Sequence, residues 1–234
     1  MRKYGARLTV AALFAAQGIL AGEPAKAGRQ FQIDDAWGRD IVEFRTSAPL
    51  EEIAGTNNHV TGVLRADPDH LRNGAASARI EILLSSFKTG IEMRDGHVAK
   101  ALGAEKHPKA VFVLGDIATA SKETLEPNVA VDITGSGMLE LNGIRRTIPY
   151  SARLTYVPAG GPFSQMRPGN FVKLVAHFDV SLDDFAVERK GPVLELQVGP
   201  SAHVTVTALA SDASPEEAAR YRRSAANYLG KVLN

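Results

Sequence analysis

Hydrophobic and polar residues alternate with a period of two along most of the chain after residue 30. The clearest run covers 147–156, where every even-numbered position is apolar and the odd-numbered positions are mostly polar. Residues 172–180 and 204–208 repeat this pattern. Because successive side chains of a strand point to opposite faces, the pattern predicts strands with one apolar face and one solvated face.

Shorter segments of the same kind extend the prediction to most of the chain. Roughly eight to ten strand candidates, separated by glycine, proline and asparagine, favour an all-β antiparallel barrel or sandwich. Asn142-Gly143 predicts a two-residue hairpin turn, because both residue types tolerate a positive φ. The shorter candidates are 40–46, 51–55, 60–66, 78–84, 110–119, 129–141 and 193–198.

Two segments break the alternation and predict helices. The first is a short helix near 95–103, which we expect Asp95 to cap and Gly103 to close. The second is an amphipathic helix over 213–234, and its start, Ser214-Pro215-Glu216-Glu217, has the composition of a capping box. We expect this helix to pack across the barrel wall or its open end. Its alternatives are a membrane-surface helix, with a weak alanine-rich apolar face, or a docking element for a partner protein.

The first 27 residues have the composition of a secretory signal peptide. Arg2, Lys3 and Arg7 precede an apolar run over 8–21, and Ala25-Lys26-Ala27 supplies a small-x-small cleavage site. The run is shorter than the ~20 residues that a transmembrane helix needs. We therefore predict cleavage near Ala27 and a periplasmic protein whose barrel domain covers 28–212; an uncleaved anchor helix is the alternative.

Composition narrows the classes of function. Removing residues 1–27 takes away four basic residues and one acidic residue, so the net charge changes from +1 to −2. Balanced charge and only 6% aromatic residues argue against nucleic-acid binding. Cysteine is absent, which excludes disulfides and cysteine-based metal sites. The fold must therefore be stabilised by its core.

The sequence matches the motifs of known enzymes only weakly. Ser85-Ser86-Phe87-Lys88 and Lys88-Thr89-Gly90 match two motifs of penicillin-binding enzymes, but those motifs need two different lysines far apart in sequence. No phosphate loop, dinucleotide fingerprint or nucleophile elbow is present. The six histidines have no ligand-like spacing, so no metal or cofactor is predicted, although distant histidines can still assemble a site.

Arg94, Asp95 and His97 form the densest polar cluster, where a loop enters the first predicted helix. A helix N-terminus flanked by arginine and histidine can hold an anionic head group such as a phosphate or a carboxylate. In the alternative interpretation the three residues order the loop and bind no ligand.

Several motifs, in order along the mature chain, resemble the YceI-like family of periplasmic, lipocalin-like, polyisoprenoid-binding proteins. They are Phe31-Gln32-Ile33-Asp34, Val42-Glu43-Phe44, the Ser-x-x-Thr-Gly string within 85–90, Arg94-Asp95-Gly96-His97, Pro108-Lys109-Ala110-Val111-Phe112, the hairpin 134–146 and Ser181-Leu182-Asp183-Asp184-Phe185. The resemblance implies an eight-stranded antiparallel barrel that holds a long apolar chain, such as a polyisoprenoid or a fatty-acid derivative, in its lumen.

Under that resemblance, Arg94, Asp95 and His97 would orient the head group, and inward-facing apolar residues would line the lumen. Small inward residues at Gly62, Ala66, Ala152, Ala176 and Ala208 are expected to leave volume for the ligand. The candidates for the lumen lining are Val42, Phe44, Leu64, Ile148, Tyr150, Leu154, Leu174, Phe178 and Val206.

The chain also departs from the family pattern. Trp37-Gly38-Arg39-Asp40 stands where many members have His-Ser, and Ala101-Leu102-Gly103-Ala104 replaces an aromatic pair. Ala186 replaces a usual glycine, and the helix from Ser214 lies beyond the usual end of the family. Two other functions stay open: an enzyme that uses His97 and Asp95 as an acid–base pair, and a structural envelope protein with a filled core. A monomer and a homodimer are both compatible with the sequence.

Overall fold

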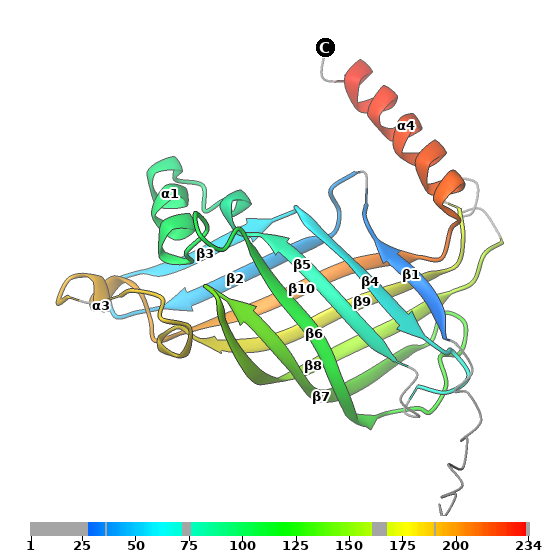
Figure 1. Ribbon diagram of the computed structural model, residues 1–234, viewed down its shortest axis with the longest axis horizontal. Helices are drawn as coiled ribbons and strands as arrows, with labels where there is room; N and C mark the ends of the chain where they lie inside the picture. Colours follow the sequence, from blue (N-terminus) through cyan, green and yellow to red (C-terminus); the bar gives the residue numbers. More distant parts are fainter. Residues whose placement is uncertain (1–27, 36, 72–75, 161–167, 190, 233–234) are drawn as a thin grey trace, which may run out of the picture.

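The computed structural model describes residues 28–35, 37–71, 76–160, 168–189 and 191–232, with the side chains of 225–232 excluded. Ten antiparallel strands form one continuous sheet in these residues (Figure 1). Their bounds are β1 Arg29–Ile33, β2 Ile41–Ser47, β3 Glu52–Asn57, β4 Val60–Ala66, β5 Ser77–Leu83, β6 Lys109–Ala120, β7 Ala130–Leu141, β8 Ile144–Val157, β9 Phe171–Ser181 and β10 Ser201–Ser211.

Eight of these strands close into a barrel. The order is β1-β4-β5-β6-β7-β8-β9-β10, and β10 returns to β1 through the pair Gln32 and Ser211. The hairpin of β2 and β3 adds two strands that extend from β10 at one end. The predicted eight-stranded antiparallel barrel is therefore confirmed, with β2 and β3 as extra strands.

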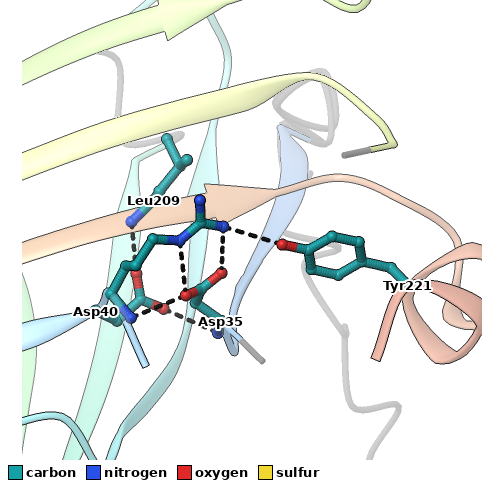
Figure 2. Close-up of polar contacts among 5 residues, drawn as sticks. Asp35, Asp40, Leu209 and Tyr221 are labelled. Carbon is teal, nitrogen blue, oxygen red and sulfur yellow. Dashed lines mark hydrogen bonds and ion pairs between the residues drawn. The ribbon is translucent and has the colours of Figure 1, made fainter. Parts of the chain in front are cut away.

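The closure leaves a gap in the ladder along β10. Residues 203–207 of β10 pair with β2, and Ser211 pairs with β1, so Leu209 lies between the two partners. The buried carboxylate of Asp40 lies at this position, where the chain passes from β1 to β2 (Figure 2). One oxygen accepts the N–H of Leu209 at 2.8 Å, and the other accepts the N–H of Asp35 at 3.0 Å. Asp40 thus joins β10 to the end of β1 where no strand can do so.

Turn chemistry accounts for several connections. Asn142 and Gly143 have φ values of 52° and 73° and form the predicted two-residue hairpin between β7 and β8. Ala186 follows the 3₁₀ helix η2 (Asp183–Phe185) and has φ 50° and ψ 34°, in the left-handed region. Glycine adopts this conformation without strain. The glycine that the resemblance implies at this position would fit this conformation.

Two details of the predicted secondary structure are wrong. The segment 193–198 contains the short helix α3 (Leu194–Gln197) instead of a strand, because it crosses the end of the barrel where it meets no continuous strand edge. Asp95 lies inside α1 (Glu92–Ala101), and the cap position is Ile91, which makes no side-chain cap. The expected helix at this place does exist, and Gly103 follows it with φ 70°.

Helix α4 (Pro215–Val232) begins with the predicted capping box. The Ser214 Oγ accepts the Glu217 N–H at 3.3 Å, and the Glu217 carboxylate accepts the Ser214 N–H at 2.9 Å. Figure 1 shows α4 running away from the barrel wall instead of covering it, at the end opposite to α1 and α3. Its early turns are held by Tyr221, whose hydroxyl accepts from Arg39 at 2.9 Å (Figure 2), and by Arg222, 2.5 Å from Asp34.

The predicted signal peptide lies outside the described residues. Within those residues, no helix is long and apolar enough to cross a membrane.

Replacing the buried carboxylate at the seam tests its structural role. We expect Asp40→Ala to lower the free energy of unfolding by about 3 kcal/mol, because two N–H donors lose a charged acceptor. Asp40→Asn keeps one acceptor oxygen and should lose roughly half as much. Urea denaturation followed by circular dichroism measures both, with the exposed Asp69→Ala as a control expected to stay within ~0.5 kcal/mol. Equal stability of Asp40→Ala and the control would contradict this role.

Candidate ligand-binding site

A cavity of about 610 Å³ occupies the end of the barrel that carries α1, α3 and the β2–β3 hairpin. Its volume falls within the roughly 300–1,000 Å³ typical of small-molecule sites. The inner wall is almost entirely apolar and comes from β2, β3, β5, β6, β7, β9 and β10 and from the loops beside them. Its buried apolar members are Val42, Ile53, Ile82, Leu84, Phe87, Ala110, Leu139, Leu141, Phe178, Val180, Leu182, Val187 and Ala202.

The cavity reaches the surface between α1 and α3. Ile91 and Met93 on the α1 side and Leu194 on α3 line the cavity and are also exposed, Met93 by 75%. Leu50 lies beside α3, since its N–H donates to the carbonyl of Leu196 at 2.9 Å. We call Leu50, Ile91, Met93, Val193, Leu194 and Leu196 the apolar rim.

The other half of the lumen is filled. Phe112 stacks on Phe178 with ring centroids 5.5 Å apart, and it meets Tyr150 edge-on at 5.9 Å. Beyond these rings remains a pocket of about 40 Å³. Two glycines of β7 make room for the rings: a Cβ at Gly137 would lie 2.3 Å from Phe112, and one at Gly135 would lie 2.8 Å from the Tyr150 hydroxyl. The aromatic side chains therefore form the floor of the cavity.

Tyr150 places a polar atom in this filled half. Its hydroxyl is buried and has no hydrogen-bond partner in the described part of the chain. Burial, together with the nearby Asp116, raises the pKa of Tyr150 to about 12. The phenol is therefore protonated throughout the physiological range, and its burial carries an uncompensated desolvation cost.

Arg94 crosses the mouth of the cavity. Its Nη1 donates to the Glu51 carboxylate at 2.5 Å, which joins α1 to the turn before β3. Its Nε and Nη2 donate to the hydroxyl and carbonyl oxygens of Thr89, both at 3.2 Å. All three guanidinium nitrogens of Arg94 thus already have acceptors within the protein.

Asp95 stabilises the loop before α1 instead of lining the cavity. Its Oδ1 accepts both the N–H and the hydroxyl of Thr89 at 2.7 Å, and these hydrogen bonds, with Lys88 3.4 Å from Oδ2, lower its pKa. Lys88 in turn forms a bridge with Thr56 of β3, which fastens the loop to the hairpin. Asp95 does not line the cavity, whereas Arg94 and the exposed His97 do.

Comparison with known proteins identifies the family. A model of the YceI-like domain matches residues 32–210 of this chain. The chain belongs to the YceI-like family. A search of curated proteins finds no match.

Solved structures with the YceI-like fold resemble this chain at low sequence identity. BcnA of Burkholderia cenocepacia has a TM-score of 0.57 and 18% identity, covering 76% of this chain and 99% of its own. A polyisoprenoid binding domain of Saccharophagus degradans has a TM-score of 0.54 and 15% identity, covering 79% and 98%. The Campylobacter jejuni YceI protein has a TM-score of 0.52 and 17% identity, covering 68% and 85%.

The YceI-like motif around the mouth is thus a structural unit in this chain. The Ser-x-x-Thr-Gly string supplies Thr89, and the Arg-Asp-x-His string supplies both groups that bind it. Arg94 and Asp95 thus order the loop, and the expectation that they orient a head group together with His97 stays a prediction. Only Arg94 and His97 of the three head-group candidates reach the cavity.

The nine lumen candidates divide between the two halves of this YceI-like barrel. Val42, Phe44 and Phe178 line the open cavity, and Ile148 is buried without lining either space. Phe178 also borders the filled half, together with Leu64, Tyr150, Leu154, Leu174 and Val206. Of the small residues expected to leave volume, Ala66, Ala152 and Ala176 border only the pocket of about 40 Å³ in the filled half. Gly62 lets β5 approach closely, and Ala208 is buried without lining either space.

Sequence reasoning missed most of the open cavity. Ile82, Leu139 and Leu141 lie on segments already predicted as strands, so alternation within 78–84 and 129–141 could have found them. Alternation within 40–46 also places Thr46 on the face of Val42 and Phe44, whereas the residues of α3 lay in a segment predicted as a strand. In the described residues, no group of three histidine, aspartate or glutamate side chains is placed to hold a metal ion.

A matched pair of variants tests the unpartnered hydroxyl in the filled half. We expect Tyr150→Phe to leave the free energy of unfolding unchanged or to raise it by up to about 1 kcal/mol. Tyr156→Phe should lower it by about 1 kcal/mol, because the Tyr156 hydroxyl accepts from Arg29 at 2.9 Å. Urea denaturation of both variants measures the difference, and a greater loss in Tyr150→Phe than in Tyr156→Phe would contradict this description.

Proposed function

We propose that this YceI-like protein binds one long apolar chain, of isoprenoid or fatty-acyl type, and carries or sequesters it in the periplasm. The observation that carries the proposal is the apolar cavity of about 610 Å³, which opens at one end of the barrel and is closed by aromatic rings at the other. Such a shape fits a flexible chain that enters from one end with its polar group last.

The energy of burial is large enough for useful affinity. Each buried methylene contributes about 0.8 kcal/mol. A tail of roughly ten carbons therefore contributes about 8 kcal/mol before the costs of association, and longer tails contribute more. Affinity thus comes from the tail, while the polar groups at the mouth orient the head.

The relatives support binding of this kind of ligand. One solved structure of the same fold is described as a polyisoprenoid binding domain. The predicted signal peptide supports a periplasmic site of action, where a chain of this kind needs protection from water between membranes.

The polar groups at the mouth favour a binding protein over an enzyme. Both carboxylate oxygens of Asp95 are engaged by Thr89 and Lys88. Of the two residues expected to form an acid–base pair, His97 lines the cavity and Asp95 does not.

Blocking the mouth tests the proposal. Ala101 lines the cavity from α1, and Ala101→Trp should lower the affinity for a fluorescent long-chain fatty acid at least about tenfold, because the indole fills the entrance. Ala54→Trp on the exposed face of β3 is the matched control and should bind like the parent protein. Fluorescence titration at equal protein concentration measures both, and equal affinity of the two variants would contradict the assignment of this cavity.

The apolar rim supports a transient contact with a lipid surface. Its six hydrophobic side chains are exposed around the opening through which the ligand would pass. Exposed apolar clusters of this kind mark interaction sites. If the rim touches a bilayer, the chain can move between membrane and lumen without crossing water. We assign the contact to the rim and not to α4, which lies at the opposite end of the barrel.

A pair of methionines tests the role of the rim. Met93→Ser should slow the transfer of a fluorescent lipid from phosphatidylcholine vesicles several-fold, and the equilibrium affinity is measured beside the rate because Met93 also lines the cavity. Met138→Ser, on the outer wall beside Val113, removes a comparable exposed side chain away from the mouth and should transfer at the parent rate. Stopped-flow transfer assays compare them, and equal rates in both variants would argue against the rim.

A further inference from the structure

The polar groups of the cavity are not arranged for an anion. Among the described residues that line it, Arg94 is the one guanidinium or ammonium group, and the carboxylates of Glu51 and Glu188 line the same cavity. His97, Gln197 and Thr46 complete the polar lining. When the histidine is neutral, the two carboxylates of this lining therefore outnumber its one guanidinium group.

Arg94 is also occupied. Glu51 accepts from its Nη1, and two oxygens of Thr89 accept from its remaining nitrogens. The pair with Glu51 is partly shielded, with the Arg94 side chain 22% exposed. A phosphate bound to Arg94 would lie beside the Glu51 carboxylate, so two anions would share one guanidinium inside a partly desolvated mouth.

Thr46 offers a different contact. It lies on the inward face of β2 with Val42 and Phe44, it lines the cavity, and it is 5% exposed. Its Oγ1 is buried and has no hydrogen-bond partner in the described part of the chain. Gly199 lies against it, since a Cβ there would come within 3.0 Å of Oγ1. A buried hydroxyl without a partner is unfavourable until a ligand supplies one.

We infer that the cavity selects an amphiphile whose polar end is uncharged, such as an alcohol, an amide or a carbonyl compound, and that this end hydrogen-bonds to Thr46. The inference rests on the proposed binding of an apolar chain and specifies the class of head group. It replaces the sequence-based expectation of an anion held by Arg94 and His97.

Two probes with the same tail and different heads test the inference. Geranylgeraniol and geranylgeranyl monophosphate are titrated into the full-length mature protein at pH 8, above the ordinary pKa of histidine. We expect the alcohol to bind at least about tenfold more tightly. If the phosphate binds more tightly, the head-group inference is overturned while chain binding stands. If neither binds, the proposed function itself fails.

Substitutions then test which residues determine the preference for the alcohol over the phosphate. Thr46→Val should lower the affinity for the alcohol about fivefold, and Thr46→Ser, which keeps a hydroxyl, should retain most of it. Glu51→Gln should raise the affinity for the phosphate several-fold, because it frees Arg94 from a competing charge. Thr61→Val, on the exposed face of β4, is the control. Thermal melts establish that each variant is folded, and unchanged alcohol affinity in folded Thr46→Val would overturn the assignment to Thr46.

Discussion

The closure of the barrel between β10 and β1 is the constraint on which the rest of this structure depends. A closed sheet leaves no free edge. Here β1 and β2 share one side of β10, and the break between them leaves no strand opposite Leu209 on that side. Asp40 accepts that N–H and the N–H of Asp35 together. Because β2 is held in place in this way, its inward residues Val42 and Thr46 can form a wall of the cavity.

The same lumen is both a core and a binding site. Rings of Phe112, Tyr150 and Phe178 fill one half, and glycines on β7 allow them to lie across the barrel. This packing stabilises the closed sheet and sets the depth to which a chain can enter. The open half can stay free of large side chains because the loop around Thr89, α1 and the β2–β3 hairpin cover it from outside.

Period-two alternation predicted an antiparallel barrel or sandwich because it shows which side chains share a face, and it correctly marked nearly every strand. The resemblance to the YceI-like family then implied the barrel. Alternation could not predict how the lumen is divided, since it is the same whether inward side chains meet in the middle or leave a space. The packing of the Phe112 ring over Gly137 of the neighbouring strand decides how the lumen is divided. Residues 193–198 alternated like a strand but met no strand edge. Two segments that depart from the family pattern, Trp37-Gly38-Arg39-Asp40 and the added C-terminal helix, contact each other. The Arg39 side chain hydrogen-bonds to the Tyr221 hydroxyl of that helix.

The central claim is that the open half of the lumen holds one long-chain amphiphile. Native mass spectrometry of the protein purified from its own cell envelope tests it most directly. The account predicts a complex of one protein with one apolar molecule, which is released as an intact lipid when the protein is unfolded in the gas phase. A spectrum showing only unliganded protein, before and after incubation with long-chain isoprenoids and fatty acids, would contradict it.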